Sequence, residues 1–128
     1  MGSRFEGSGV LVTGGAAGMG RAIAEAFLGE GAEVVIADIN EERVGQTAEE
    51  LGAGGGKVSS LGVDVTNEGQ VGEMIARGDE VLGGIDVLVN NAGVGGDPRL
   101  PEMSDEEWAR GLDVTLNGTF RCTRPGLR

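Results

Sequence analysis

A glycine-rich stretch near the start of the chain has the residue types and spacing to hold a phosphate group. Gly14, Gly18 and Gly20 follow the apolar run Val10–Val12 in the pattern Thr-Gly-x-x-x-Gly-x-Gly, and a helical pattern begins after them. Glycine can adopt a positive φ in a tight turn, and it has no Cβ to block a pyrophosphate. The backbone N–H groups of such a turn and of the following helix converge on one place. The alternative is a plain strand-to-helix turn, because 26 of the 128 residues are glycine.

Asp38 ends a second apolar run, residues 33–38, and could bind a ribose. A carboxylate at the tip of this strand is placed to accept hydrogen bonds from the 2′- and 3′-hydroxyls of an adenine ribose. The same carboxylate would repel a 2′-phosphate, and neither Ala16, Ala17 nor Ile39 supplies a cation to offset this repulsion. NAD is therefore the expected cofactor, in preference to NADP. The alternative role for Asp38 is that of a helix-capping or loop aspartate.

Asp64 lies near the end of a third strand pattern, residues 57–65, and two roles are open for it. An aspartate followed by the apolar Val65 could line an adenine pocket at the carboxyl end of this strand. It could equally begin the turn into the next helix and cap that helix together with Thr66 and Asn67.

Apolar periodicity places these residues on alternating strands and helices. It predicts helices over residues 18–30, 41–51 and 67–82 and a fourth strand over residues 85–89. Three strand–helix units with short links imply right-handed parallel crossovers, so we expect a Rossmann-type, doubly wound α/β sheet of order 3-2-1-4. The first and fourth strands are neighbours in that order. The glycine-rich turn would then face Asn90–Gly93 across the crevice where ligands bind.

The composition excludes several classes of partner and site. Acidic residues outnumber basic ones by 21 to 10, for a formal net charge of −11, so neither nucleic acid nor an anionic membrane is an expected partner. The chain has no histidine, which excludes a histidine base and a His-bearing metal site, and no metal is expected. The single Cys122 excludes an intrachain disulfide. With no apolar run of transmembrane length and no signal-type segment, the expected location is cytoplasmic.

Together these motifs resemble the N-terminal half of the short-chain dehydrogenase/reductase family. The resemblance rests on the turn over residues 13–20, on Asp38, on the pair Asp64-Val65, and on the sequence Asn90-Asn91-Ala92-Gly93. It extends past Trp108 to Gly118-Thr119-Phe120 and so covers nearly the whole chain. It implies one NAD-binding domain over residues 1–128 that is incomplete relative to the family, truncated after strand four and a partial following helix.

The resemblance also implies which residues would contact the dinucleotide. The phosphates would lie along the glycine-rich turn, the adenosine ribose at the end of strand two, the adenine at the end of strand three, and the nicotinamide side near the end of strand four. The corresponding residues are Gly14, Gly18, Met19 and Gly20, then Asp38 and Ile39, then Asp64 and Val65, and finally Asn91, Ala92 and Gly93. Asn90 is expected to brace strand four.

Two departures from the family pattern bear on catalysis. The family carries a serine and a Tyr-x-x-x-Lys segment farther along, whose tyrosine hydroxyl exchanges a proton with the alcohol or carbonyl as hydride is transferred. This chain has no tyrosine, and its only lysine is Lys57. Thr115 stands where the family usually has an asparagine whose backbone helps hold a water, and Asn117 is expected on a helix face instead. No catalytic residue is therefore expected, and the chain should be inactive as it stands.

The end of the sequence predicts self-association. Ending at Arg128 would leave the apolar strand at 87–89 at a sheet edge with unpaired backbone groups, which invites pairing with another chain. Family relatives use the helix expected at 113–124 in dimer contacts, and Pro125 with Gly126 should end that helix.

The connection between the fourth strand and the last helix carries fewer signals. Residues 94–103 are expected to form a surface loop, and Ser104 should cap the start of a short helix. Trp108 is expected in the core.

Three functions fit these observations. The first is an NAD-dependent oxidoreductase of the short-chain type, acting on an alcohol or ketone and represented here by its cofactor-binding half. The second is a nucleotide-binding module or pseudoenzyme that binds NAD without hydride chemistry. The third is a structural fragment that self-associates through its open sheet edge.

Overall fold

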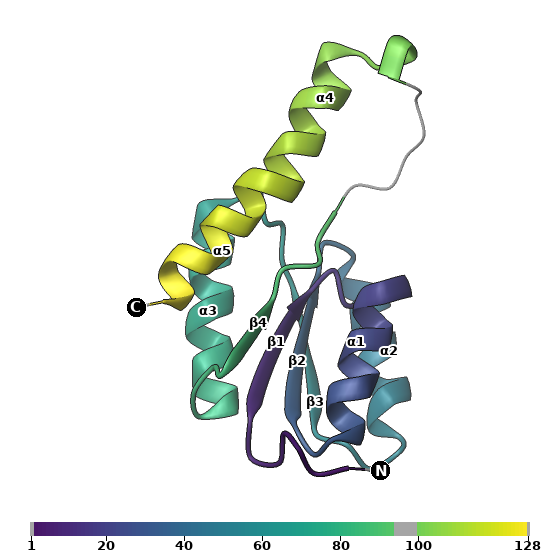
Figure 1. The fold of residues 1–128 in the computed structure, drawn as a ribbon, viewed down its shortest axis with the longest axis vertical. Helices are drawn as coiled ribbons and strands as arrows, with labels where there is room; N and C mark the ends of the chain where they lie inside the picture. The colour runs from purple at the N-terminus through teal and green to yellow at the C-terminus, as the bar shows by residue number, and fades with distance from the viewer. Residues whose placement is uncertain (1, 94–99, 128) are drawn as a thin grey trace.

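The computed structural model describes residues 2–93 and 100–127 and has a parallel sheet at its centre (Figure 1). Its strands are β1 (Gly9–Thr13), β2 (Glu33–Asp38), β3 (Val58–Gly62) and β4 (Val87–Val89), arranged in the order β3-β2-β1-β4. Val10 of β1 is paired with Val34 on one side and with Val87 on the other. The predicted doubly wound sheet and its order 3-2-1-4 are therefore confirmed.

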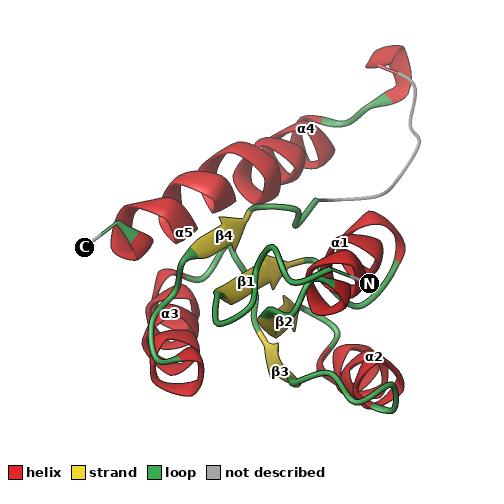
Figure 2. Cartoon of the chain, turned by 60° about the horizontal axis from the view of Figure 1, so that its bottom comes forward, coloured by secondary structure: helices red, strands yellow, loops and turns green. Residues whose placement is uncertain are grey.

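Helices cover both faces of the sheet (Figure 2). One face carries α1 (Gly18–Gly29) and α2 (Glu41–Gly52), and the other carries α3 (Glu68–Leu82) and α5 (Gly118–Gly126). Successive strand residues point to opposite faces, so Val10 and Val12 belong to one apolar cluster while Leu11 belongs to the other. None of the helices in the described part of the chain combines the length and apolar composition needed to cross a membrane.

Polar side chains cap the starts of three helices. Asn40, Asn67 and Ser104 each accept a hydrogen bond from the backbone N–H three residues later, at 3.0, 3.0 and 3.1 Å. They cap α2, α3 and α4 (Asp105–Leu112), respectively. Gly83, with a φ of 69°, ends α3 as a left-handed cap.

The third strand is shorter than its apolar pattern predicted. β3 ends at Gly62 rather than at Val65, because the chain turns after the Val63 N–H bonds the Asp38 carbonyl at 2.9 Å. Val63 and Val65 are nevertheless buried. The apolar pattern predicts which residues are buried, and buried residues continue here past Gly62, the last residue of β3 that pairs with β2. The pattern therefore placed the end of the strand too late.

The fourth strand begins two residues later than its pattern predicted, at Val87 rather than at Ile85. Asp86 occupies the approach to the strand and bonds Gly9 twice. Its backbone N–H donates to the Gly9 carbonyl and its carboxylate accepts from the Gly9 N–H, each at 2.8 Å. The edge position expected for this strand is observed within the four-stranded sheet.

A continuous helical rod runs from Asp105 to Gly126 and extends beyond the sheet (Figure 1). It consists of α4, the π-helical turn η2 (Asp113–Asn117) and α5. The short helix expected after Ser104 and the helix expected over 113–124 are therefore joined end to end. Pro125 and Gly126 were expected to end the helix, and α5 does end at Gly126. Pro125 lies within the last turn, which still closes because the Leu127 N–H bonds the Thr123 carbonyl at 3.0 Å.

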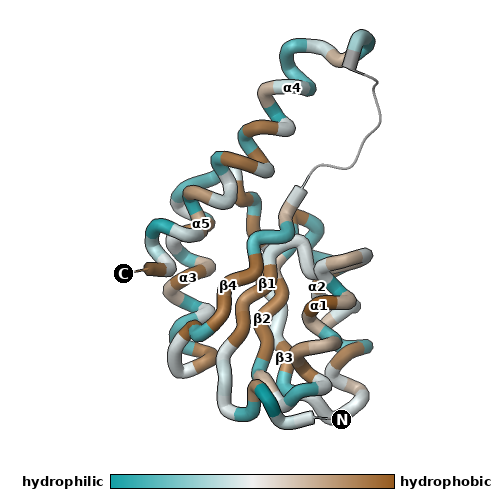
Figure 3. Tube along the Cα trace, viewed as in Figure 1, coloured by the Kyte–Doolittle hydropathy of each residue, from teal (hydrophilic) through white to brown (hydrophobic). Residues whose placement is uncertain are grey.

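Trp108 is not part of the core, contrary to expectation. Its side chain is 55% exposed, and none of the described residues of α4 is buried. The reason is that α4 lies past the end of the sheet, away from the described strands and the helices that cover them (Figure 3). Of the surface loop expected at 94–103, residues 94–99 lie outside the described residues, and Leu100–Glu102 form a short 3₁₀ turn, η1.

Gly20 lets the start of α1 pack directly against the ends of β1 and β4. It is buried, and a Cβ at this position would collide with the carbonyl oxygen of Gly14 and press on the side-chain amide of Asn91. Gly72 of α3 is the opposite case. No described atom lies within 4 Å of the position that its Cβ would take.

We expect Gly20→Ala and Gly72→Ala to change the free energy of unfolding in opposite directions. Gly20→Ala should lower it by about 1–3 kcal/mol, because the backbone must move to admit a methyl group. Gly72→Ala should raise it by about 0.5–1 kcal/mol, because alanine favours the helix and meets no clash. Denaturant unfolding followed by circular dichroism measures both, and equal effects would contradict the close packing at Gly20.

Candidate functional site

The turn between β1 and α1 leaves backbone N–H groups available to a ligand. Gly14 and Gly18 have φ values of 66° and 58°, which glycine adopts without strain. No described side chain caps α1, whose N-cap is Ala17, whereas α2, α3 and α4 are all capped by side chains. No described atom lies within 4 Å of the position of a Cβ on Gly18, so the space beside the turn is open. An uncapped helix start with open space around it suits an anionic group.

The hydroxyl of Thr13 joins the carboxyl ends of β1 and β4. Thr13 is buried, and its Oγ1 accepts hydrogen bonds from the backbone N–H groups of Asn91 (3.1 Å) and Ala92 (3.0 Å). The same hydroxyl donates to the carbonyl of Val89 at 3.4 Å. The side-chain amide of Asn91 then donates to the Gly14 carbonyl at 3.1 Å. The glycine-rich turn and the segment after β4 are thereby held side by side.

Asp38 fixes two backbone segments at the end of β2. One of its carboxylate oxygens accepts from the N–H of Ala16 in the glycine-rich turn, and the other accepts from the N–H of Asn40, both at 3.1 Å. Helix capping itself is done by Asn40. A carboxylate offers about four acceptor positions, so each oxygen of Asp38 can still accept a hydrogen bond from a hydroxyl group.

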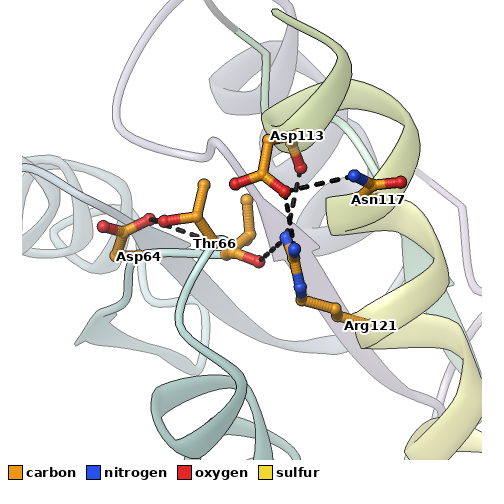
Figure 4. A network of polar contacts seen from close by, with 6 residues as sticks. Asp64, Thr66, Asp113, Asn117 and Arg121 are labelled. Atoms are coloured by element: carbon orange, nitrogen blue, oxygen red, sulfur yellow. Dashed lines mark hydrogen bonds and ion pairs between the residues drawn. The ribbon is translucent and has the colours of Figure 1, made fainter. Parts of the chain in front are cut away.

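Asp64 shapes the turn after β3 (Figure 4). Its Oδ1 accepts from the backbone N–H of Thr66 at 2.9 Å and from the Thr66 hydroxyl at 2.7 Å. These hydrogen bonds hold the pKa of the Asp64 carboxyl below its ordinary value. Asn67, not Asp64, caps α3. The turn-forming role of Asp64 is thus observed. Asp64 also lines the cavity at the carboxyl ends of the strands, so this role is compatible with the one at the adenine.

The carboxyl ends of all four strands open onto a cavity of about 170 Å³. The structure brings most of the predicted site residues together there, from the turn after β1, the end of β2, the turn after β3 and the segment after β4. They are Gly14, Asp38, Ile39, Asp64, Val65, Ala92 and Gly93. Positions far apart in the sequence therefore meet at the crevice that the strand order predicted.

Four predicted residues are not among the described residues that line this cavity. Gly18 borders a hollow on the other side of the turn, beside Arg21. Met19 is 72% exposed in the first turn of α1. Gly20 and Asn91 have structural contacts instead. Gly20 lets α1 pack closely against the Gly14 carbonyl, and the side-chain amide of Asn91 donates a hydrogen bond to the same carbonyl.

Five residues that line the cavity were not predicted from the sequence. Thr13, Ala37 and Val63 adjoin predicted positions, and a polar residue between a buried strand and a glycine turn could have drawn attention to Thr13. Arg110 and Val114 come from the helical rod. Their spacing carried no signal, because only the tertiary fold brings the rod to the ends of the strands.

The residues considered in connection with a proton relay lie elsewhere. Thr115 is exposed in η2, and its carbonyl accepts from the Thr119 hydroxyl at 2.7 Å. Asn117 is exposed on the helix and donates to the Asp113 carboxylate at 3.2 Å. Asn90 donates to the hydroxyl of Thr123 at 3.0 Å, so it ties the end of β4 to α5.

Comparisons with known proteins agree with this architecture. The family model described as short chain dehydrogenase matches residues 8–128. A relative from Mycobacterium tuberculosis, (5R,7aS)-5-hydroxy-7a-methyl-1-oxo-2,3,5,6,7,7a-hexahydro-1H-indene-carboxyl-CoA reductase, is 48% identical over 126 residues, which cover 97% of this chain and 48% of the relative. The chain thus spans about half the length of the curated relatives it matches.

Solved structures match over the same extent. A short chain dehydrogenase from Mycobacterium smegmatis superposes with a TM-score of 0.93 at 44% identity, covering 98% of this chain and 53% of that one. A short chain dehydrogenase from Burkholderia cenocepacia, solved in complex with NADP, superposes with a TM-score of 0.89 at 29% identity, covering 98% and 51%. The motifs, the strand order and these matches lead to one conclusion: the chain belongs to the short-chain dehydrogenase family.

Proposed function

We propose that residues 1–128 form a domain that binds NAD across the carboxyl ends of β1 to β4, as the cofactor-binding half of an oxidoreductase that acts on an alcohol or ketone. The observation that carries this proposal is the convergence of three features on one crevice. They are Gly14 of the glycine-rich turn, the Asp38 carboxylate, and an apolar wall that includes Val65. When bound, the nicotinamide would supply or accept the hydride.

The residues present fit a dinucleotide from end to end. The turn at Gly14 and Gly18 offers backbone donors and open space to a pyrophosphate. Asp38 would accept the ribose hydroxyls, with Ile39 beside it. Asp64 and Val65 would flank the adenine, and the segment Asn91–Gly93 would lie toward the nicotinamide.

The electrostatics at the ribose end favour NAD over NADP in this proposal. The Asp38 carboxylate would face a 2′-phosphate, and two like charges at close range repel. Arg21, a cation of the first turn of α1, is engaged with Glu50 at 2.6 Å. Among the described residues that line the cavity, Arg110 is the one cation, and it approaches from the helical rod beside Asp64.

We expect the unmodified chain to bind NAD more tightly than NADP, and Asp38→Asn to weaken NAD binding about tenfold or more. Hydrogen bonds to a charged group contribute about 1.5–3 kcal/mol, and 1.4 kcal/mol corresponds to tenfold in affinity. Calorimetric titration with each dinucleotide measures both effects. The matched control is Asp86→Asn, because Asp86 also accepts a backbone N–H, that of Gly9, but at the opposite end of the sheet. Tighter binding of NADP by the unmodified chain would refute the assigned preference.

In this proposal the chain binds the cofactor but does not turn over by itself. It contains no tyrosine, and its one lysine, Lys57, directly precedes β3, at the opposite end of the strands from the cavity. A side chain there is out of reach of a substrate that meets the nicotinamide. Thr115 is exposed on the rod and its carbonyl is engaged with Thr119, so neither group replaces the missing acid or base.

We accordingly expect no formation of NADH when the chain is incubated with NAD and a panel of primary, secondary and steroid alcohols. Absorbance of the reduced nicotinamide follows the reaction, and calorimetry on the same sample establishes that NAD is bound. Measurable NADH would refute the assignment of inactivity. Binding without turnover in a protein that includes the rest of the family fold would favour the second candidate, a non-catalytic nucleotide-binding module.

A second candidate function, self-association with another copy of the chain, is favoured by an apolar stripe on the helical rod. Trp108, Leu112, Leu116 and Phe120 recur every four residues, and their side chains are 55%, 39%, 64% and 58% exposed. Figure 3 shows apolar positions recurring along α4 and α5. Exposed apolar surface of this extent is typical of an interface, and β4 adds an edge strand to the same molecule.

We expect sedimentation equilibrium to show a reversible dimer that Leu116→Glu weakens at least about tenfold, because each buried leucine side chain contributes about 1.5–3 kcal/mol to association. Val81→Glu is the control, since Val81 is 44% exposed on α3, away from the stripe. A monomer at all concentrations, or an equal effect of the two substitutions, would contradict this assignment.

A further inference from the structure

Arg121 connects two segments of the chain that meet only through the tertiary fold. Its side chain is 21% exposed, and its guanidinium lies between the turn after β3 and the π-helical turn η2 (Figure 4). It donates to the Val65 carbonyl at 3.3 Å, to the Asp113 carbonyl at 3.2 Å and to the Asp113 carboxylate at 2.5 Å. One planar cation therefore serves three acceptors on two segments.

Both of these segments form walls of the cavity. Val65 lines it from the turn after β3, and Val114, which directly follows Asp113, lines it from the rod. The contacts of Arg121 thus set the position of one wall relative to the other, although Arg121 itself is not among the described lining residues.

The π-helical turn depends on the same cation. The Asp113 carbonyl accepts the N–H of Gly118, five residues on, in addition to the guanidinium of Arg121. The Asp113 carboxylate also accepts from Asn117 at 3.2 Å, and these donors hold the pKa of Asp113 below its ordinary value. Asp113 is therefore ionised at neutral pH and keeps the ion pair with Arg121. A π-turn inside a helix is rare, and such turns are frequently found at functional sites.

The rod packs closely against the turn after β3 at Gly118. A Cβ on Gly118 would lie 2.9 Å from Cγ2 of Val65, so the two segments touch almost backbone to side chain. A movement of the rod would therefore be transmitted directly to Val65.

Arg124, one turn later on α5, provides the contrast. It pairs with Glu68 of α3 at 2.6 Å, and both side chains are about half exposed or more. Neither belongs to the described lining of the cavity. Both arginines lie on α5. The contacts of Arg121 join two walls of the cavity, whereas the contact of Arg124 joins α5 to α3.

We propose that Arg121 is a positioning residue for cofactor binding, which holds Val65 and Val114 at the separation that grips the adenine. This inference rests on the proposed dinucleotide site. In this proposal the contacts of Arg121 increase the affinity for the adenosine end of the cofactor. They do not change the affinity for the nicotinamide end.

The test compares three variants by NMR-monitored titration with AMP, NMN and NAD, alongside thermal unfolding. We expect Arg121→Met to weaken AMP and NAD by the same factor, about tenfold, and to leave NMN unchanged, since the loss of charge-assisted contacts acts on the adenine walls alone. Arg121→Lys, which keeps the charge but not the planar fork, should give a smaller loss. Arg124→Met should leave the affinities for all three ligands unchanged.

Each outcome decides the matter. AMP affinity in Arg121→Met equal to that of the unmodified chain, an equal loss in Arg124→Met, or an equal loss for NMN would overturn the positioning role while the proposed function stands. If the unmodified chain binds neither AMP nor NAD, the proposed function fails instead. If Arg121→Met does not fold, the folded Arg121→Lys variant decides, and an unchanged AMP affinity there would overturn the inference.

Discussion

The parallel pairing of β1 with β4 is the constraint on which the rest of the site depends. The buried hydroxyl of Thr13 bonds the backbone of Val89, Asn91 and Ala92, so the carboxyl ends of the two strands cannot slide past each other. A slip of one residue would turn every side chain of a strand to the other face of the sheet. Both the glycine-rich turn and the segment after β4 take their places from this register, and the cavity opens between them.

The carboxylates at the cavity form hydrogen bonds to backbone N–H groups of the protein itself. Asp38 bonds the N–H groups of Ala16 and Asn40, and Asp64 bonds Thr66. Because a carboxylate has two oxygens with several acceptor positions, fixing a turn does not prevent it from accepting a ligand donor. The two roles considered for Asp64 are therefore compatible, and the same holds for Asp38.

The helical rod is the part of the molecule that departs most from local expectation. Trp108 has the residue type of a core position, yet α4 extends beyond the sheet and leaves it exposed. Pro125 lies inside the last turn of α5. Where the rod does contact the sheet layer, Gly118 and Arg121 bring it within reach of Val65, and Val114 becomes part of the cavity wall.

The sequence by itself determined the features that depend on neighbouring residues. The period of apolar positions specified the strands and helices, Asn67 and Ser104 marked two helix starts, and the short links implied the strand order. The tertiary structure alone decided which side chains meet across long separations, such as Arg121 and Val65, 56 positions apart. The physical reason is that local patterns reflect backbone geometry and burial, whereas a cavity wall or an ion pair depends on the relative placement of whole elements. The rod shows the difference. Its helices were predicted from the sequence, but its contact with the ends of the strands was not.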